Sequence, residues 1–335
     1  MSKKPEPLVT VVIPARNNEG TIREVLEAVH SQTYRNIEVV LVDGASEDDT
    51  VGIASNFRVK IIIEKAMGPN YARNLGIRNA RGEFVAFIDG DCKPDARWIE
   101  SLLEPLSNPK VGVVGGTIDV WNSGKYLPAY GHLARIPVMP RFEARMVQNM
   151  VRFNELPVST NMIVRKSVFS EAGFFDESYR GGFEETEFLW RVVKSGYDLV
   201  DEPFAVVYHW NRERLSGLLA QTWRYGLGAG KFCNKHPDSP VTKKYHKYDL
   251  YFAGFLCLLL LILMGSLRFH QLLLAVLLMV VVPLAGSSFC YLKQASRRGA
   301  WSILLAYPIL DFLRASAFCS AQMYSELFEK LRRSR

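Results

Sequence analysis

The sequence predicts an α/β fold for the N-terminal part of the chain, with a mostly parallel sheet and helices on both faces. A C-terminal membrane region with a helical hairpin is predicted to follow it. Segments with strand and helix patterns alternate between residues 8 and 118. The strand segments are apolar almost throughout, which is typical of parallel strands buried on both faces. From residue 251 onward, long apolar segments indicate helices that enter a bilayer.

Each element follows from a local pattern of apolar residues. Residues 19–30 place four aliphatic side chains at helical spacing on one face. The turn after the first strand, residues 14–19, lacks the Gly-x-Gly-x-x-Gly pattern and so disfavours a dinucleotide-binding fold. Strands are predicted at residues 8–13, 37–42, 59–63, 84–88 and 111–118, and helices at residues 19–30, 48–56, 70–80 and 96–106.

Residues 119–158 show no regular alternation, but they contain one apolar stripe at helical spacing. The stripe comprises Phe142, Met146, Met150 and Phe153, and the basic residues beside it are Arg141, Arg145 and Arg152. Two interpretations stay open for this stripe: an amphipathic helix on a bilayer, or an ordinary surface helix. Residues 159–210 return to the globular pattern, and residues 203–208 are predicted to form a strand before His209.

A change in composition sets the predicted domain boundaries. Residues 1–235 are predicted to form the globular domain, residues 236–250 a linker and residues 251–335 the membrane region. Spans are expected at residues 251–267 and 272–292, with a tight turn at residues 268–271. Residues 301–324 are apolar but contain Asp311 and Arg314, a pair that usually faces protein or an interface. This third segment is left open as interfacial, re-entrant or spanning.

Basic clusters beside the apolar segments set the predicted topology, because such clusters stay in the cytoplasm. They lie at residues 243–244, 293–298 and 330–335. Two spans keep all three clusters inside, whereas a third full span would place the tail outside. No apolar leader follows Met1, which predicts that there is no signal peptide. The sequence therefore predicts a multi-pass protein of the cell membrane with a cytoplasmic globular domain.

The composition excludes other classes of protein. The net charge is +7, but no dense basic stripe with interleaved aromatic residues is present, so a nucleic-acid partner is not expected. The basic residues gather instead around the apolar C-terminal third, which fits an anionic membrane surface. Five cysteines occur without a Cys-x-x-Cys pair, which indicates reduced thiols rather than a zinc site.

The most informative motif is Asp89-Gly90-Asp91, directly after a buried strand. Ligands of open α/β sheets bind at the carboxyl ends of the strands, where this motif lies. Two carboxylates there suit Mg²⁺ or Mn²⁺, ions that also hold phosphates. A plain turn is the alternative interpretation.

Further polar side chains are expected at the same edge. Asp43 ends the second strand, where its carboxylate can accept a hydrogen bond from a nucleobase, and Ser46 or Asp48 is expected to cap the next helix. Arg73 follows the third strand and is predicted to point toward base or phosphate, with an ordinary surface arginine as the alternative. The carboxylates of residues 184, 185 and 187 gather at a predicted helix start. Favourable placement in the helix dipole is the alternative interpretation, but three carboxylates exceed what a dipole requires.

At this point the chain resembles a known family. The segments at residues 13–19, 43–50, 72–74 and 87–91 look like those of family 2 glycosyltransferases with the GT-A fold. Later segments at residues 160–162, 173–177, 182–191, 207–209 and 221–225 are similar to further elements of that family, in family order. The resemblance covers residues 8–230. It implies a GT-A nucleotide-diphospho-sugar transferase fold for the globular domain.

The resemblance also implies a role for individual residues. Glu185 would be the catalytic base, with Glu184 beside it, and Asp91, Asp89 and His209 would hold the metal, Mg²⁺ or Mn²⁺. The nucleotide sugar would be held by Pro14, Ala15, Arg16, Glu19, Asp43, Asn70, Arg73, Asp89 and Gly90. The acceptor or the diphosphate would be held by Asn161, Glu187, Gln221 and Arg224.

Four positions depart from the family pattern. Ala45 and Asp49 stand where glycines are usual, which affects the local loop geometry. Glu185 replaces the usual aspartate and so reaches one methylene further, and Tyr225 replaces a tryptophan.

The function that follows is an inverting, metal-dependent transfer of a hexose from a nucleotide-diphosphate sugar to a hydroxyl group. The predicted acceptor is a lipid-linked glycan at the cytoplasmic face of the membrane. A hydroxyl acceptor is predicted because the carboxylate cluster can supply a general base. A phosphate acceptor is already ionised and needs no base. A polyprenyl-phosphate or dolichyl-phosphate sugar synthase is the first alternative; the family resemblance implies that dolichyl-phosphate mannose synthases lack such a helix. A processive polysaccharide synthase and an inactive sugar-nucleotide-binding subunit are the others.

Overall fold

The computed structural model describes residues 6–134, 139–151, 156–266 and 272–333. The chain divides into two compact units. The first unit contains residues 1–132 and 137–213, and the second contains residues 133–136 and 214–335. The sequence placed the boundary near residue 235 and a linker at residues 236–250, whereas the structure continues as helix through residues 240–250.

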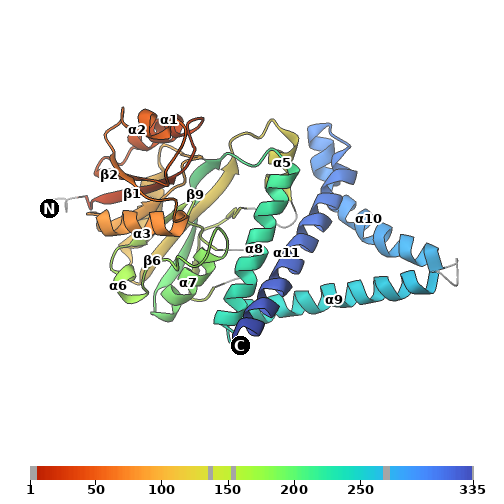
Figure 1. Ribbon diagram of the computed structural model, residues 1–335. Coiled ribbons are helices and arrows are strands. Elements are labelled where there is room, and N and C mark those ends of the chain that lie inside the picture. The colour runs from red at the N-terminus through yellow and green to blue at the C-terminus, as the bar shows by residue number, and fades with distance from the viewer. Residues whose placement is uncertain (1–5, 135–138, 152–155, 267–271, 334–335) are drawn as a thin grey trace. The chain divides into compact units, whose positions relative to one another are not determined.

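The first unit is built on a nine-stranded sheet with the order β3-β2-β1-β4-β8-β6-β9-β5, in which β7 also pairs with β9 (Figure 1). The strands are β1 (Val9–Ala15), β2 (Ile37–Asp43), β3 (Lys60–Ile63), β4 (Phe84–Phe87), β5 (Cys92–Pro94), β6 (Val111–Val120), β7 (Met146–Gln148), β8 (Met162–Arg165) and β9 (Asp198–His209). All the strands expected before residue 119 are present.

The sheet is parallel in one half and mixed in the other. Strands β3, β2, β1 and β4 are parallel neighbours, as the repeated strand–helix pattern predicts. Strand β8 then lies antiparallel between β4 and β6. The second half also contains a parallel pair, β6 with β9, so it is mixed rather than purely antiparallel. Strand β8 follows the irregular segment rather than a helix, so no crossover forces it to be parallel.

Helices cover both faces of the parallel half. The helices of this unit are α1 (Ile22–His30), α2 (Thr50–Ala54), α3 (Pro69–Asn79), α4 (Trp98–Leu103), α5 (Tyr126–Leu133), α6 (Val168–Glu171) and α7 (Glu184–Lys194), and a 3-10 helix spans Glu104–Ser107. Val39 and Leu41 of β2 belong to the core that includes α1. Val40 and Val42 pack instead with Ala72 of α3. Because side chains alternate along a strand, β2 is buried on both faces.

The apolar stripe at residues 142–153 does not form a helix where the structure describes it. Met146 lies in strand β7, which pairs with β9. Arg145 donates hydrogen bonds to Glu104 and Glu202, which raise the pKa of its guanidinium. This arginine is therefore held by protein rather than free for a bilayer. Arg152 and Phe153 lie outside the described residues.

The second unit consists of four helices: α8 (Leu215–Lys235), α9 (Pro240–Ser266), α10 (Leu272–Arg298) and α11 (Ile303–Arg333). Helix α8 packs closely on α11, because glycines on α8 allow the backbones to approach. A Cβ added at Gly226 would lie 2.3 Å from the carbonyl oxygen of Phe318. One added at Gly230 would lie 2.5 Å from that of Gln322.

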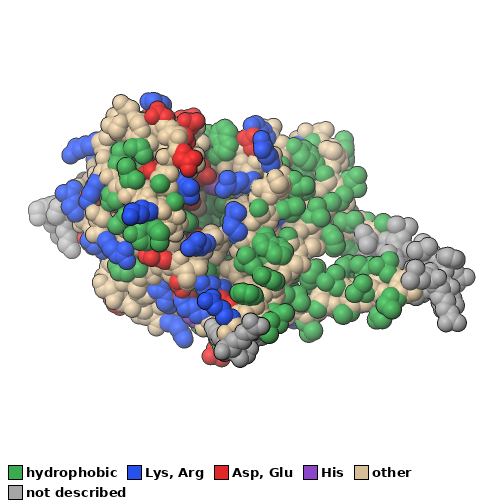
Figure 2. Space-filling model, in the orientation of Figure 1, with side chains coloured by type: hydrophobic (Ala, Val, Ile, Leu, Met, Phe, Trp, Pro, Cys, Tyr) green, Lys and Arg blue, Asp and Glu red, His purple; other side chains and the backbone are tan. Residues whose placement is uncertain are grey.

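Two helices among the described residues have the length and composition to cross a membrane, Pro240–Met264 in α9 and Ile303–Glu329 in α11. Figure 2 shows hydrophobic side chains along α9, where Leu260 and Leu261 are exposed. Asp311 of α11 accepts a hydrogen bond of 2.6 Å from the hydroxyl of Tyr291 on α10, so it faces protein. The turn expected at residues 268–271 lies outside the described residues. Whether α11 spans the bilayer stays a prediction.

Candidate active site

Several segments of the first unit bring ionisable side chains to the carboxyl end of β4. Asp89 and Asp91 follow β4 directly, and Gly90 between them allows close packing. A Cβ at Gly90 would lie 2.8 Å from the side-chain oxygen of Asn18. The backbone nitrogen of Gly90 donates to the carbonyl of Pro14, at 3.3 Å. The two aspartates are thus held against the end of β1 rather than on a loose turn.

Arg73 of α3 joins Asp89 to the start of α7. Its Nη2 lies 3.1 Å from Oδ1 of Asp89, and its Nη1 lies 3.7 Å from Oε1 of Glu184. The guanidinium is buried, which alone would lower its pKa, but the charges of Asp89, Glu185 and Glu184 raise the pKa. Arg73 therefore stays protonated and bridges two carboxylates. The alternative of an ordinary surface arginine is excluded.

Asp89 is held at both of its oxygens. Arg73 occupies Oδ1, and the hydroxyl of Thr160 donates to Oδ2 at 3.1 Å. Thr160 lies just before β8, so the antiparallel strand supplies part of the support for this carboxylate. The carboxylate of Asp91 has fewer described hydrogen-bond partners than that of Asp89, so the two aspartates of the motif differ in their environment.

Glu184 and Glu185 differ sharply in environment. Glu184 is buried and accepts a hydrogen bond of 2.5 Å from the backbone nitrogen of Gly182. Burial, and next the charge of Glu185, raise the pKa of Glu184 to about 7 against the opposing effect of Arg73. Glu185 is half-buried, and its Oε1 accepts a hydrogen bond of 2.5 Å from the hydroxyl of Ser159. Glu185 is thus the more accessible of the two.

The raised pKa of Glu184 predicts a pH-dependent stability. The folded pKa is about 7 and the ordinary value 4.5, so Glu184 holds its proton longer in the folded protein. Its contribution to stability is fully present below pH 4.5 and is lost as the pH rises through about 7. We expect Glu184→Gln to gain stability relative to wild type across this window, on the order of 3 kcal/mol in total. Urea unfolding at several pH values measures this gain, and a constant difference between the two proteins would contradict it.

Asp91 faces His209, the last residue of β9. Oδ1 of Asp91 lies 3.8 Å from Nε2 of His209, which is too far for a hydrogen bond. The thiol of Cys92 lies 3.4 Å from the same oxygen. Burial, with the charges of Asp91 and Asp89, raises the pKa of this thiol well above its usual range. Cys92 therefore stays a neutral thiol, and Asp91 and His209 are the pair suited to bind a cation.

The donor set fits a divalent cation of the Mg²⁺ or Mn²⁺ type. Such ions prefer carboxylate oxygens, and Mn²⁺ also accepts imidazole nitrogen. One ion with ligands at about 2.1 Å can contact both Asp91 and His209 across the gap between them. Asp91 also keeps 27% of its side chain exposed, so the site stays open to a ligand from outside. Asp91 and His209 would hold the ion, with Asp89 alongside.

Two loops beside this centre are joined by hydrogen bonds. The backbone nitrogen of Asn17 donates to the hydroxyl of Ser46 at 2.9 Å, and that of Asp49 donates to Oε2 of Glu19 at 3.1 Å. Asp43 is buried and accepts from the backbone and the hydroxyl of Ser46. Arg16 is exposed beside them. A contact of Asp43, Arg16, Glu19 or Ala15 with a nucleotide stays a prediction.

Helix α2 has Asp49 at its N-cap position, and no described side chain makes a capping hydrogen bond there, although Asp48 contacts the first turn. Oδ1 of Asp48 accepts from the backbone nitrogen of Thr50, the first residue of α2, at 3.1 Å. Ser46 instead contacts Asp43 and Asn17. Neither Ser46 nor Asp48 occupies the N-cap position of α2, so the predicted cap is wrong in register.

Ala45 adopts a left-handed backbone conformation with φ of 54°. An L-residue with a Cβ is disfavoured there by roughly 1 kcal/mol, whereas glycine is not. We expect Ala45→Gly to raise the free energy of unfolding by up to about 1 kcal/mol, as measured by urea denaturation. Ala54→Gly in α2 is the matched control, and it should lower stability by about 1 kcal/mol or more. A loss of stability in Ala45→Gly would contradict the assignment of strain.

Asn161 has a structural role rather than the predicted contact with the acceptor. It is fully buried, and its amide nitrogen donates to the carbonyl oxygens of Thr117 and Ala205, each at 2.8 Å. Its amide oxygen accepts from the indole nitrogen of Trp98 at 2.8 Å. Because the amide is buried and bound on both sides, the predicted acceptor role is wrong.

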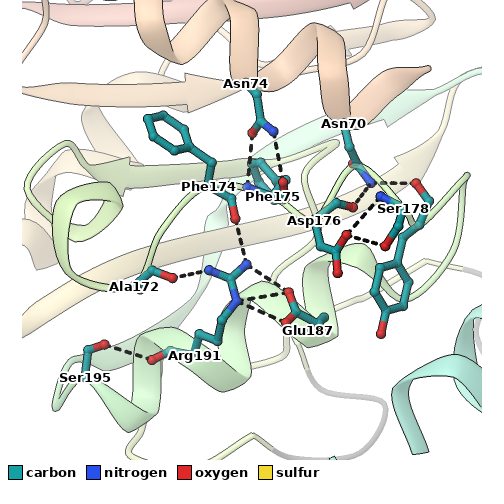
Figure 3. Close-up of polar contacts among 11 residues, drawn as sticks. Asn70, Asn74, Ala172, Phe174, Phe175, Asp176, Ser178, Glu187, Arg191 and Ser195 are labelled. Atoms are coloured by element: carbon teal, nitrogen blue, oxygen red, sulfur yellow. Dashed lines mark hydrogen bonds and ion pairs between the residues drawn. The ribbon is translucent and has the colours of Figure 1, made fainter. Parts of the chain in front are cut away.

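Glu187 is likewise structural, which corrects its predicted contact with the acceptor. Figure 3 shows the guanidinium of Arg191 between Glu187 and the carbonyl groups of Ala172 and Phe174. The Arg191–Glu187 pair is 2.8 Å long, and the carboxylate of Glu187 is fully buried. This pair fastens the loop before α7 to the helix itself. Helix-dipole placement thus accounts for only part of the acidic cluster.

Asn70 orients Arg73 rather than facing a nucleotide. Its side-chain oxygen accepts from Nη1 of Arg73 at 3.1 Å. Its nitrogen donates to the carbonyl oxygen of Tyr179 and to that of Asp176, the second of which Figure 3 shows. Asn70 is buried, so its predicted direct contact with a ligand is wrong. It acts through Arg73 instead.

Gln221 and Arg224 lie on α8 in the second unit, where the side chain of Gln221 donates to the hydroxyl of Tyr225 at 3.1 Å. Their predicted contact with acceptor or diphosphate stays a prediction. Sequence reasoning missed Ser159 and Thr160, which bind the side chains of Glu185 and Asp89. A hydroxyl pair between an irregular segment and a strand gives no local signal of that role.

Known proteins resemble this chain over much of its length. The profile of the family described as Glycosyl transferase family 2 matches residues 10–173. The pre-mycofactocin glycosyltransferase of Mycobacterium tuberculosis is 31% identical over 244 residues, which cover 69% of this chain and 48% of that relative. Glycosyltransferase AglE of Haloferax volcanii is 31% identical over 232 residues, which cover 66% of this chain and 73% of AglE. This chain thus spans about half the length of the mycobacterial relative.

A solved structure shares the fold. The mannosyltransferase PcManGT from Pyrobaculum calidifontis, in complex with GDP-Man and Mn²⁺, has a TM-score of 0.60 and 19% sequence identity. The match covers 97% of this chain and 88% of that chain. At this identity the likeness concerns the fold.

Proposed function

This chain belongs to glycosyl transferase family 2 and has the GT-A fold, and we propose that it moves a hexose from a nucleotide-diphosphate sugar to a hydroxyl group of a lipid-linked glycan. The transfer inverts the configuration at the anomeric carbon and uses Mg²⁺ or Mn²⁺. The proposed place of reaction is the cytoplasmic face of the cell membrane.

The observation that carries the proposal is the charged array around Asp89 and Asp91. Asp91 and His209 face each other across a gap suited to a cation, and Arg73 joins Asp89 to Glu184. A divalent cation bound there would neutralise the diphosphate leaving group as a Lewis acid. Arg73, held by Asn70, would keep the carboxylate of Asp89 oriented. PcManGT was solved with a nucleotide sugar and Mn²⁺, which supports this choice of donor and cation.

Glu185 is the proposed general base. It is half-buried, and Ser159 fixes one of its oxygens while the other is left for an acceptor hydroxyl. Glu184 is buried against Arg73, so it shapes the electrostatics of the site rather than meeting the acceptor. One base and one cation site support a single in-line displacement, and hence inversion.

The donor is tested by screening nucleotide sugars for hydrolysis with Mn²⁺. Hydrolysis of one donor class above the rate of the Asp91→Ala variant supports the proposal. Equal rates in both proteins for every donor would favour an inactive sugar-nucleotide-binding subunit.

The acceptor class is tested separately. A lipid-linked saccharide with a free hydroxyl is expected to accept sugar better than bare polyprenyl phosphate, because only the hydroxyl needs a base. Thin-layer analysis of labelled product from both acceptors decides between them. If polyprenyl phosphate is the better acceptor and Glu185→Gln keeps its activity on it, the enzyme is a polyprenyl-phosphate sugar synthase. Chain extension beyond one sugar would indicate a processive synthase.

The topology of the membrane region is tested with a reporter fused after Arg335. Two spans keep the three basic clusters on one side, so the reporter is expected in the cytoplasm. Helix α11 is apolar and long enough to cross a membrane, so the side on which the reporter lies depends on whether α11 crosses. Labelling of the reporter from outside the cell would show a third crossing.

A further inference from the structure

A buried asparagine contacts His209 on the side away from Asp91. Oδ1 of Asn211 lies 2.7 Å from Nδ1 of His209. Both residues are buried, and Asn211 is only 8% exposed. A neutral imidazole carries one proton, which sits on either of its two ring nitrogens. The partner of Nδ1 therefore determines what Nε2 can do.

The orientation of the Asn211 amide is fixed by a second contact. Its side-chain nitrogen donates to the carbonyl oxygen of Pro128 at 3.1 Å. A flipped amide would place two oxygens against each other at that point, so the amide oxygen must face His209. An oxygen can only accept, and Nδ1 of His209 must therefore carry the proton.

The backbone of Asn211 is held as firmly as its side chain. Its nitrogen donates to the side-chain oxygen of Asn122 at 2.9 Å, and its carbonyl accepts from the side-chain nitrogen of Asn122 at 3.0 Å. Asn122 thus holds Asn211 by two reciprocal bonds. The acceptor facing Nδ1 is fixed before any ligand arrives.

We propose that Asn211 is a positioning residue that selects the Nδ1-protonated tautomer of His209 and so turns an unprotonated Nε2 toward the cation site. The inference rests on the proposed function, since it takes His209 to be a metal ligand. A metal-bound histidine that donates its other N–H to a fixed acceptor is held in the correct tautomer and ring orientation. Nε2 lies 3.8 Å from Oδ1 of Asp91, and the proposed cation would bind between these two atoms.

The first experiment reads the tautomer directly. Long-range ¹⁵N–¹H spectra of the full chain, labelled at its histidines, distinguish protonated from unprotonated ring nitrogens. The chain has six histidines, and the signal lost in His209→Ala identifies His209. We expect wild-type protein without metal, at alkaline pH, to carry the proton on Nδ1. A proton on Nε2 would overturn the inference and leave the proposed reaction intact.

The second experiment measures Mn²⁺ binding by electron paramagnetic resonance, with Mn²⁺ alone and with UDP or GDP added. Asn211→Ala should shift His209 toward the Nε2-protonated tautomer and weaken Mn²⁺ binding about 10- to 100-fold. Asn211→Asp keeps an acceptor for Nδ1 but sets its second oxygen against the carbonyl oxygen of Pro128, so it should lower stability while it retains the tautomer and binds Mn²⁺ within a few-fold of wild type. If only the tautomer or only the affinity changes in Asn211→Ala, the inference fails.

A matched control separates this role from a loss of packing. Gln32 is also a buried amide bound to backbone groups, those of Asp95 and Ile99, and it does not bond to a histidine among the described residues. Gln32→Leu should lower stability while leaving both the tautomer and the Mn²⁺ affinity unchanged. If His209→Ala binds Mn²⁺ as tightly as wild type, the proposed cation site itself is wrong, and the inference falls with it.

Discussion

Replacing Asp91 by alanine is expected to abolish sugar transfer while leaving the fold intact. The carboxylate faces His209 at the proposed cation site, and without it the leaving diphosphate loses its Lewis acid. Such stabilisation is worth several kcal/mol, which corresponds to on the order of 10³-fold or more in rate. The side chain is partly exposed and its described contacts are few, so unfolding should change little. Labelled-sugar transfer and thermal unfolding of the same preparation measure both effects.

Removal of the cation should reproduce this loss. EDTA is expected to abolish transfer by the wild-type protein, and added Mn²⁺ should restore it in wild type but not in Asp91→Ala. Asp238→Asn, which changes an exposed carboxylate in the second unit, is the control for a mere change of charge. Full activity in EDTA would disprove the assignment of the metal.

Glu185→Gln should lower kcat by about 10²- to 10⁴-fold with little change in donor affinity. A general base acts in the transition state, so its removal affects turnover rather than donor binding. Glutamine keeps the size of the side chain and can still accept the hydrogen bond from Ser159. Steady-state kinetics over a range of donor concentrations separate kcat from KM.

The neighbouring glutamates give a matched series. Glu187→Gln breaks the buried pair with Arg191, so it should cost several kcal/mol of stability, while the protein that remains folded stays active. Glu184→Gln should mainly change the pH dependence of stability. If Glu184→Gln or Glu187→Gln is instead the variant whose kcat collapses, the base has been assigned to the wrong residue.

The parts of the fold and site that the sequence predicts are those set by local pattern. The end of an apolar strand placed Asp89 and Asp91, and the alternation of strands and helices placed the parallel half of the sheet. The antiparallel position of strand β8 was not predicted, because its pairing depends on where the chain rejoins the sheet after a long irregular segment. Sequence spacing carries no information about that return.

The errors among the site residues share one physical cause. Asn161, Glu187 and Asn70 have polar side chains at motif positions, but the structure buries them against backbone groups or a partner side chain. A polar residue that satisfies a buried carbonyl and one that meets a ligand look alike in a sequence. The reverse holds for Ser159 and Asn211, which are unremarkable in the sequence and become informative only through the groups they contact.

The glycine contact between α8 and α11 also constrains the order of events during synthesis. Helix α8 leaves the ribosome well before α11, and the first unit precedes both. Domains fold from the N-terminus as they emerge from the ribosome. The first unit is therefore complete before α11, which packs on the glycine face of α8, has been synthesised. The atoms nearest to a Cβ at Gly226 or Gly230 all belong to α11, so this contact forms only after α11 has been synthesised. Nascent α8 therefore exposes its glycine face until α11 has been synthesised.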